Sequence, residues 1–311
     1  MFVLVTGGAG FIGSHSVDAL LAQGARVRVL DNLTTGSLAN LGHVRDRIEF
    51  VEGDIRDPDC VEAAIKGITH VLHLAALVSV PASIEAPVHS HSINSLGFIQ
   101  VLDAARRAGV ARMVYASSAA VYGVPAQLPL DDASPVAPMS PYGLEKLVND
   151  QYAALYGELY GLSALGLRFF NVYGPRQDPG SSYSGVISKF ADWAMRGEDF
   201  AVYGDGLQTR DFICVTDIAR CNVAALLGAA RGVVNLATGT SVTMLELAQA
   251  FEAVTGRKIG VRHLPPRTGD IVHSAVTPKR MREELGVRET VSLQDGLGQL
   301  VMHLRQHSSG H

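Results

Sequence analysis

The stretch Thr6-Gly7-Gly8-Ala9-Gly10-Phe11-Ile12-Gly13 follows an apolar run at residues 2–6 and precedes an amphipathic stretch at residues 14–23. We interpret this order as a buried strand, a glycine-rich turn and a helix. Glycine is needed where the backbone turns tightly, approaches a pyrophosphate closely and lets the helix pack on the strand. The helix N-terminus then offers its free N–H groups to the phosphates. An ordinary strand–helix turn is the alternative, but the pattern favours a dinucleotide site with contacts from Gly7, Gly10, Phe11, Ile12 and Gly13.

Two further turns in the same half of the chain point to the same ligand. Asp31 ends the second predicted strand and follows Gly13 by 18 positions. A carboxylate at this place binds a ribose 2′-hydroxyl and repels a 2′-phosphate, which favours NAD over NADP. The turn after the third strand carries Asp54, which either accepts a hydrogen bond from the adenine or simply caps a helix. Asn32 and Ile55, the neighbours of these two carboxylates, complete the predicted cofactor contacts of the turns.

The first half of the chain alternates apolar runs with amphipathic stretches. Continuously apolar strands separated by helices predict a parallel sheet covered on both faces, with right-handed crossovers. The predicted fold class is therefore α/β: a Rossmann-type, doubly wound parallel sheet with a smaller α/β C-terminal lobe for the substrate. The predicted strands are residues 2–6, 26–30, 48–52, 70–74, 113–116 and 164–169, and the predicted helices are 14–23, 61–66, 94–107 and 142–160.

The texture changes after Gly174, where residues 175–185 are rich in Pro, Gly and Ser. We expect a nucleotide-binding domain over 1–171, with segments near 205–240 returning to it, and a substrate lobe over 172–204 and 241–306. The tail 307–311 is interpreted as an expression remnant. The later predicted elements are a helix at 186–196, a strand into 212–215, a helix at 217–230, further elements at 233–236 and 243–255, and two closing helices.

The composition narrows the class of protein. Glycine is abundant at 32 of 311 residues, without the three-residue period of collagen, and 47% of residues are hydrophobic, which suits a globular core rather than a disordered chain. The net charge of −4 argues against a nucleic-acid binder, which usually carries a basic face. The scattered Cys60, Cys214 and Cys221 predict buried thiols in a reducing compartment and no metal site. Because neither a basic leader nor an apolar span is visible, we expect a cytoplasmic protein without membrane association.

Tyr142 and Lys146 stand four residues apart at the start of a predicted helix, so both lie on one face. A buried ammonium beside a phenol favours the phenolate and so lowers the pKa of the tyrosine. Such a tyrosine can act as general base toward a sugar hydroxyl. A solvated surface pair is the alternative, but Ser117 and Ser118 place hydroxyls at the end of the fifth strand, where ligands bind in this architecture.

With these residues the chain resembles the extended short-chain dehydrogenase/reductases, and within them the nucleotide-sugar 4-epimerases of the NAD-dependent epimerase/dehydratase family. The resemblance covers nearly the whole chain. Its landmarks are residues 6–14, 53–57, 73–76, Asn94, 117–123, 140–146, 168–175, 204–217 and 267–270.

The resemblance implies roles for individual residues. Tyr142 is the base, Lys146 is its electrostatic partner and ribose ligand, and Ser118 binds the reacting hydroxyl. Arg210 and Arg267 clamp the diphosphate, a task that suits a guanidinium fork. The implied cofactor contacts also include Leu74, Ala75, Ala76, Asn94, Ser117 and Phe169. The remaining implied substrate contacts are Asn171 on the diphosphate, Asp270 on the nucleotide ribose, Val186 and Ser274.

Four positions bear on the reaction and the substrate. The family's 4,6-dehydratases carry an acidic pair directly after the active hydroxyl, where this chain has Ala119 and Ala120, so we expect no dehydration. Val78 stands where some epimerases have a lysine, so one phosphate or cofactor contact is missing or supplied otherwise. Ser274 is small where enzymes restricted to plain hexoses carry a large residue. It predicts a pocket open to an N-acetyl group, with an incidental surface serine as the alternative because one residue rarely fixes specificity.

The predicted reaction is NAD-dependent inversion at C4 of a UDP-hexose through a 4-keto sugar, on UDP-glucose and UDP-galactose and also on UDP-GlcNAc and UDP-GalNAc. The alternatives are a UDP-uronic acid 4-epimerase, a related decarboxylase or reductase and, more distantly, an inactive NAD-binding regulator. The resemblance also implies a homodimer in which the helices near 95–107 and 142–160 form an intermolecular four-helix bundle. Apolar residues that serve either this interface or the intrachain core are Leu96, Ile99, Leu102, Leu147, Tyr152, Leu155 and Tyr156.

Overall fold

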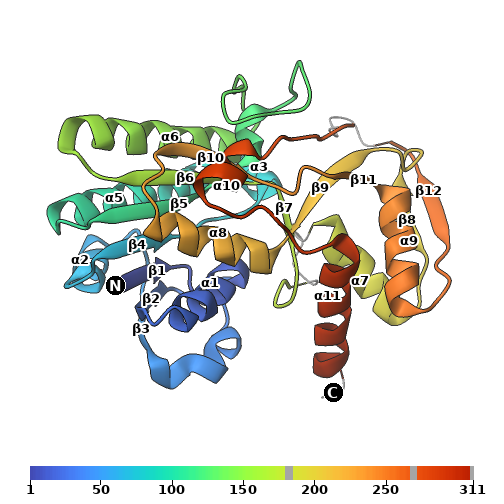
Figure 1. Ribbon diagram of the computed structural model, residues 1–311, viewed down its shortest axis with the longest axis horizontal. Coiled ribbons are helices and arrows are strands. Elements are labelled where there is room, and N and C mark those ends of the chain that lie inside the picture. The colour runs from blue at the N-terminus through green and yellow to red at the C-terminus, as the bar shows by residue number, and fades with distance from the viewer. Residues whose placement is uncertain (179–184, 267–271, 309–311) are drawn as a thin grey trace.

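A seven-stranded sheet forms the larger part of the molecule (Figure 1). The computed structural model describes residues 1–178, 185–266 and 272–308. The strand order is β10-β6-β5-β4-β1-β2-β3, and every neighbouring pair is parallel. The chain runs from β1 through β2 to β3 on one side and crosses back to β4 on the other side of β1, so the carboxyl ends of β1 and β4 adjoin a switch point, where ligands bind in such folds. The strands are β1 (Phe2–Thr6), β2 (Arg26–Asp31), β3 (Ile48–Glu52), β4 (His70–His73), β5 (Arg112–Ser118), β6 (Ala164–Phe169) and β10 (Gly232–Leu236).

Helices cover both faces of this sheet because its strands are apolar on both sides. Along β1, Val3 and Val5 contribute to one core and Leu4 to the other. This two-sided burial confirms the predicted doubly wound fold. The first face carries α1 (Phe11–Ala22), the 3-10 segment η1 (Leu38–Arg47), α8 (Val215–Leu227) and α10 (Lys279–Glu284), and the second carries α2 (Pro58–Ile65), α5 (Phe98–Arg107) and α6 (Pro141–Tyr160).

A smaller lobe follows β6 and has a core of its own (Figure 1). Its helices pack around aromatic side chains, with the rings of Phe190 and Phe200 4.1 Å apart between centroids and Phe251 edge-on to Phe200. Two small sheets, β11-β9-β7 and β12-β8, complete the lobe. Its elements are β7 (Asn171–Tyr173), α7 (Val186–Arg196), β8 (Phe200–Tyr203), β9 (Thr209–Cys214), β11 (Ser241–Thr243), α9 (Met244–Thr255), β12 (Val261–Leu264) and α11 (Leu293–Ser308).

Short helical segments follow two strands of the large sheet, before the long helices α5 and α6 begin. Between β4 and α5 lie α3 (Val80–Glu85), α4 (Pro87–His91) and the π-type turn η2 (Ser92–Gly97). Between β5 and α6 lies the 3-10 turn η3 (Ala119–Tyr122). No helix within the described part of the chain is both long and apolar enough to span a membrane.

Several predicted elements differ from the structure. Helix α1 begins at Phe11, earlier than predicted, so the glycine turn runs directly into it. The single helix predicted over 94–107 is η2 followed by α5, and the strand predicted into 212–215 ends at Cys214, where α8 takes over. The short segments η1, α3, α4, β7, β8, β11 and β12 were not predicted, and the strands among them pair with strands distant in sequence. For example, Val261 on β12 pairs with Phe200 on β8. Helix α11 also continues into the presumed tail, as far as Ser308.

Candidate active site

The glycine turn between β1 and α1 leaves no room for side chains. Gly7 has a φ of +71°, and a Cβ there would lie 2.7 Å from the backbone N of Ala75. A Cβ on Gly13 would overlap the carbonyl oxygen of Gly7. Gly10 caps α1 without a side-chain hydrogen bond. Gly7, Gly10 and Gly13 therefore present bare backbone around the start of α1, which suits a pyrophosphate that approaches the N–H groups closely.

Residues of this turn also connect to the neighbouring strand. Asp31 at the end of β2 is buried, and its carboxylate accepts hydrogen bonds from the backbone N–H groups of Ala9 and Leu33, each at 2.9 Å. A carboxylate has lone pairs beyond these two bonds, so it can still receive a ribose hydroxyl. The predicted residues beside Gly10 have separate contacts: Ile12 packs against the sheet core, and Phe11 meets the ring of His15 edge-on.

The second predicted turn holds its carboxylate by internal contacts. Arg56 binds Asp54 through Nε at 3.0 Å and Nη2 at 2.7 Å, and Asn32 donates to the same carboxylate at 2.9 Å. The hydrogen bonds from Arg56 hold the pKa of Asp54 well below its usual range. Asn32 thus links the second and third strands, while Ile55 is buried against Gly97.

Thr6 and His73 tie the carboxyl ends of β1 and β4 together. Thr6 Oγ1 lies 2.9 Å from His73 Nδ1 and accepts a hydrogen bond from the backbone N of Ala75 at 3.3 Å. Burial lowers the pKa of His73 to about 3, with a smaller effect from the nearby Lys146. The imidazole is therefore neutral at physiological pH. Neither side chain was assigned a role from the sequence. They fix the backbone of Leu74 and Ala75, two of the predicted cofactor contacts, at the carboxyl end of β4.

Asn94 holds the next residues of that edge. Its Oδ1 accepts from the backbone N of Leu77 at 2.8 Å, and its Nδ2 donates to Leu77 O at 3.1 Å. Nδ2 also donates at 2.7 Å to Glu145, a buried carboxylate on α6. Asn94 thus connects the segment that contains Ala75 and Ala76 to α6.

The predicted catalytic side chains meet where β5 ends and α6 begins. Ser140 caps α6 by accepting from the backbone N of Gly143. Tyr142 and Lys146 follow in the first two turns, both buried, with the ammonium 5.7 Å from the centre of the phenol ring. Lys146 Nζ donates to Ala116 O at 2.9 Å. Ser118, at the end of β5, interacts with the Tyr142 hydroxyl.

The predicted effect of Lys146 on Tyr142 is wrong in this structure. Burial raises the pKa of Tyr142 to about 12, and the hydrogen bond to Ser118 only partly opposes this rise. The Glu145 carboxylate raises the Tyr142 pKa further. Lys146 Nζ donates to the Ala116 carbonyl, and burial lowers the pKa of Lys146 itself to about 8. The phenol is therefore neutral in the structure, and a base role requires more positive charge beside it.

The substrate residues predicted within the described chain lie on and around the β11-β9-β7 sheet. Asn171 on β7 donates from Nδ2 to Asp211 O of β9 at 2.9 Å. Arg210 precedes Asp211 on β9, and its Nη1 donates to Thr209 O at 2.8 Å. Ser274 N donates to Thr209 Oγ1 at 3.2 Å, which brings this distant residue to the same strand.

Three other predicted residues have positions of their own. Phe169 ends β6 and packs partly against the sheet core, whereas Ser117 on β5 is buried. Val186 begins α7 and packs against the lobe core. Arg267 and Asp270 lie outside the described residues. Within the described ranges, no three His, Cys, Asp or Glu side chains group as ligands of a metal ion.

Residues 3–237 match the NAD dependent epimerase/dehydratase family. The chain is 38% identical over 313 residues to a UDP-glucose 4-epimerase of Mycolicibacterium smegmatis, covering 99% of this chain and 100% of the relative. These similarities extend through both the large sheet and the lobe.

Solved structures of similar proteins have the same fold. A UDP-N-acetylglucosamine 4-epimerase from Methanobrevibacter ruminantium, in complex with UDP-N-acetylmuramic acid, matches with a TM-score of 0.94 and 35% identity over 98% of both chains. A Thermus thermophilus UDP-glucose 4-epimerase in complex with NAD matches with a TM-score of 0.89 and 40% identity, covering 98% of this chain and 99% of that one.

Proposed function

Because the chain belongs to the NAD-dependent epimerase/dehydratase family and uses NAD, we propose that it inverts C4 of UDP-hexoses. Its relatives support a nucleotide-sugar 4-epimerase. The observation that carries the proposal is the cluster of Tyr142, Ser118 and Lys146 where β5 ends and α6 begins, in which Tyr142 and Lys146 are buried. The proposed substrates are UDP-glucose and UDP-galactose, and also UDP-GlcNAc and UDP-GalNAc.

In the proposed mechanism, Tyr142 moves the proton of the C4 hydroxyl. Ser118 donates to or accepts from the same oxygen and orients it toward the phenol. NAD, when bound, would supply the hydride acceptor and donor for C4, so that the sugar would pass through a 4-keto form and be reduced again from its other face. Tyr142 then returns the proton to the inverted hydroxyl. Because burial raises the pKa of Tyr142 to about 12, we propose that the Lys146 ammonium and the positive nicotinamide of bound NAD would together favour the phenolate.

The proposed substrate anchor lies on the lobe side of the site. Arg210 and Asn171 come from adjacent strands of one sheet, and a guanidinium and an amide together suit a diphosphate. Arg267 would join this clamp, and Asp270 would bind the nucleotide ribose. A fixed diphosphate allows the sugar ring to turn and present either face of C4 to the same Tyr142.

The residues after Ser118 favour epimerisation over the dehydration also found in the family. Ala119 and Ala120 form the start of η3, directly after the proposed hydroxyl-binding serine. Methyl side chains have no proton to give to a leaving hydroxyl. We therefore propose that the 4-keto sugar is reduced again rather than dehydrated.

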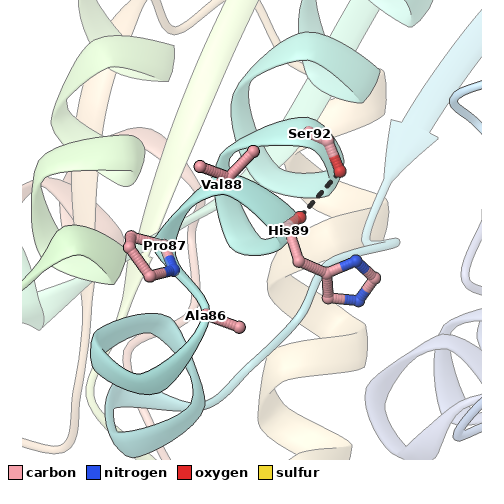
Figure 2. A pocket seen from close by; sticks show the side chains of 5 residues that line it. All are labelled: Ala86, Pro87, Val88, His89 and Ser92. Atoms are coloured by element: carbon pink, nitrogen blue, oxygen red, sulfur yellow. Dashed lines mark hydrogen bonds between the residues drawn. The ribbon is translucent and has the colours of Figure 1, made fainter.

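We further propose a homodimer formed through the outer face of α4, η2 and α6. Of the candidate interface residues, Leu102 is fully buried within the chain, and Ile99, Leu147 and Tyr156 pack against its cores. Leu96, Tyr152 and Leu155 remain exposed, and so do Leu144, Leu159 and Val88. Figure 2 shows the adjoining hollow on α4, lined by Ala86, Pro87, Val88, His89 and Ser92.

This apolar face makes a second copy of the chain the proposed occupant. Leu155→Glu, at a 48% exposed position of α6, should convert the dimer to a monomer in light scattering because it places a charge in the interface. Leu207→Glu in the lobe, at a similarly exposed leucine, should leave the dimer intact. A wild-type monomer, or a dimer unaffected by Leu155→Glu, would refute this interface.

Product analysis tests the proposed reaction. The protein would be incubated in parallel with UDP-glucose, UDP-N-acetylglucosamine and UDP-glucuronate. The mass and the amount of every product would then be compared with the substrate consumed. We expect galacto-configured products from the first two, without net NADH. Tyr142→Phe should lower the rate about 100-fold or more, whereas Tyr160→Phe, on the same helix but at its far end, should not. Conversion of glucuronate alone, or a near-normal rate in Tyr142→Phe, would reject the proposal.

A further inference from the structure

Lys146 is a charged group in an unfavourable place. Its side chain is almost fully buried, and its ammonium donates to the backbone carbonyl of Ala116 rather than forming a close ion pair within the described chain. Burial accordingly lowers the pKa of Lys146 to about 8. Since an ammonium removed from water tends to lose its proton, some other group must favour its charged form.

Asp150 lies one helical turn beyond Lys146 on α6. Residues at this spacing share a face of a helix, and Asp150 is buried on the same side against β5 and β6. Its carboxylate accepts from Tyr115 OH at 3.1 Å and from Arg168 Nε and Nη2, both at 3.1 Å. Of the charges that favour the protonated form of Lys146, Asp150 has the largest effect, ahead of Glu145.

Arg168 serves Asp150 rather than Lys146. It lies on β6 opposite Ser117 of β5, and its Nη1 donates to Tyr122 OH at 2.8 Å while its fork holds the carboxylate. Burial raises the pKa of Asp150, and Arg168 is the main opposing influence, followed by Ser117 and Tyr115.

We propose that Asp150 and Arg168 are positioning residues for Lys146: Arg168 keeps the Asp150 carboxylate ionised, and that carboxylate keeps the Lys146 ammonium charged at the edge of β5. The charge relation is a property of the folded chain. Only its use in catalysis rests on the proposed function.

The other groups around Lys146 do not supply this effect equally well. Glu145 is another carboxylate on α6, but it accepts from the neutral Ser90 and Asn94, each at 2.7 Å, and no arginine of the described residues pairs with it. His73 on β4 is neutral because its pKa is about 3. Tyr142 on α6 is neutral too. Asp150, which is paired with Arg168, is therefore the negative charge that we assign to Lys146.

The test measures the ionisation of Lys146 directly. The chain contains five lysines, at positions 66, 146, 189, 258 and 279, so lysine labelled with carbon-13 at Cε gives a short spectrum that can be titrated by NMR. Lys146→Met identifies the signal by its loss. We expect Asp150→Asn to lower the pKa of Lys146 by about 1 unit or more. Tyr115→Phe is the matched control, because it removes a hydrogen bond from Asp150 but leaves the charge.

The alkaline limb of the pH–rate profile provides a second readout and should move in the same direction as the lysine titration. A fall in the pKa of Lys146 of at least about half a unit in Asp150→Asn, with a smaller change of this pKa in Tyr115→Phe, supports the proposal. A smaller fall in Asp150→Asn, or equal falls in both variants, overturns it. The NMR titration does not depend on the reaction, so failure of the proposed function would leave this result readable.

A second variant covers the case in which Asp150→Asn does not fold, since it leaves Arg168 buried without its partner. The double variant Asp150→Asn with Arg168→Gln removes both charges together. A fall in the pKa of Lys146 is still expected, but a smaller one than in Asp150→Asn, because losing the positive charge of Arg168 offsets part of the loss of the carboxylate. An unchanged lysine titration in the double variant overturns the proposal.

Discussion

The cofactor side and the substrate side of the site are built in different ways. Around Gly7 and Gly13, backbone atoms pack so closely that a side chain cannot be added. On the β11-β9-β7 sheet, Asn171 and Arg210 instead present polar groups from strands that pair across about 40 residues of sequence. The first region requires residues without a side chain, and the second requires particular polar side chains. Added atoms should therefore damage the first region, and removed groups the second.

The largest effect is expected from Gly13→Ala. The new methyl group would overlap Gly7 O, and overpacking of about 1–3 kcal/mol corresponds to roughly a 10- to 100-fold loss of NAD affinity. The NAD content of the purified protein and a binding titration measure this loss. Gly42→Ala is the control, because nothing lies within 4 Å of its added Cβ. Normal NAD content in Gly13→Ala would contradict a cradle made of backbone.

Acid should lower the stability of the folded chain through His73, which lies on the cofactor side. Its pKa is about 3 in the folded chain against an ordinary 6.5, so between these values the unfolded chain binds a proton that the folded chain does not. The free energy of unfolding should therefore fall as pH falls from 6.5 toward 3, by about 1.4 kcal/mol per pH unit.

Urea unfolding at neutral pH and near pH 5 measures this contribution. Because of His73 alone, the free energy of unfolding should differ by about 2 kcal/mol between the two pH values. His73→Asn should flatten the dependence, whereas His263→Asn on the exposed β12 should not. An equal slope in the wild type and His73→Asn would show that His73 is not responsible.

An effect on substrate binding rather than on NAD binding is expected from Arg210→Met on the substrate side. Loss of a charged hydrogen bond of about 1.5–3 kcal/mol predicts a roughly 10-fold or greater rise in KM for the UDP-sugar. NAD content should stay normal, which separates the two regions. Arg262→Met, on the exposed strand β12 of the same lobe, is the control for loss of charge. If Arg210→Met loses NAD but keeps KM, the division between the regions is wrong.

The smallest effect is expected from Ser274→Tyr. A bulkier residue beside Thr209 should exclude an N-acetyl group and leave the plain hexose in place. We expect the ratio of kcat/KM for UDP-GlcNAc to that for UDP-glucose to fall about 10-fold. Ser241→Ala, which removes only the hydrogen bond to Ser274 O, should change this ratio less. Equal losses on both sugars would assign Ser274 a structural role.

The sequence predicted the cofactor half well because its rules are local. All six strands predicted before Gly174 lie in the large sheet, and the family, fold class and NAD dependence are confirmed. Glycine spacing and apolar runs signal such elements within a few residues. The lobe strands β8 and β12 escaped prediction because each is four residues long and is stabilised by its distant partner.

The chemistry of the site was harder to predict than its location. Spacing placed Tyr142 and Lys146 on one face, but it does not reveal that both are fully buried, which sets the direction of their pKa shifts. Asp150 carried a readable signal, four residues after Lys146. Its partner Arg168 comes from another strand and required the fold.

The most direct test of the proposed reaction follows the hydrogen on C4. UDP-glucose deuterated at C4 would be converted in ordinary water, and C4 of the UDP-galactose formed would be examined by NMR. Removal and return of the same hydrogen, with Tyr142 exchanging only the hydroxyl proton, predicts that the product retains the deuterium. Replacement of the label by solvent hydrogen at C4, or the absence of UDP-galactose, would contradict the account.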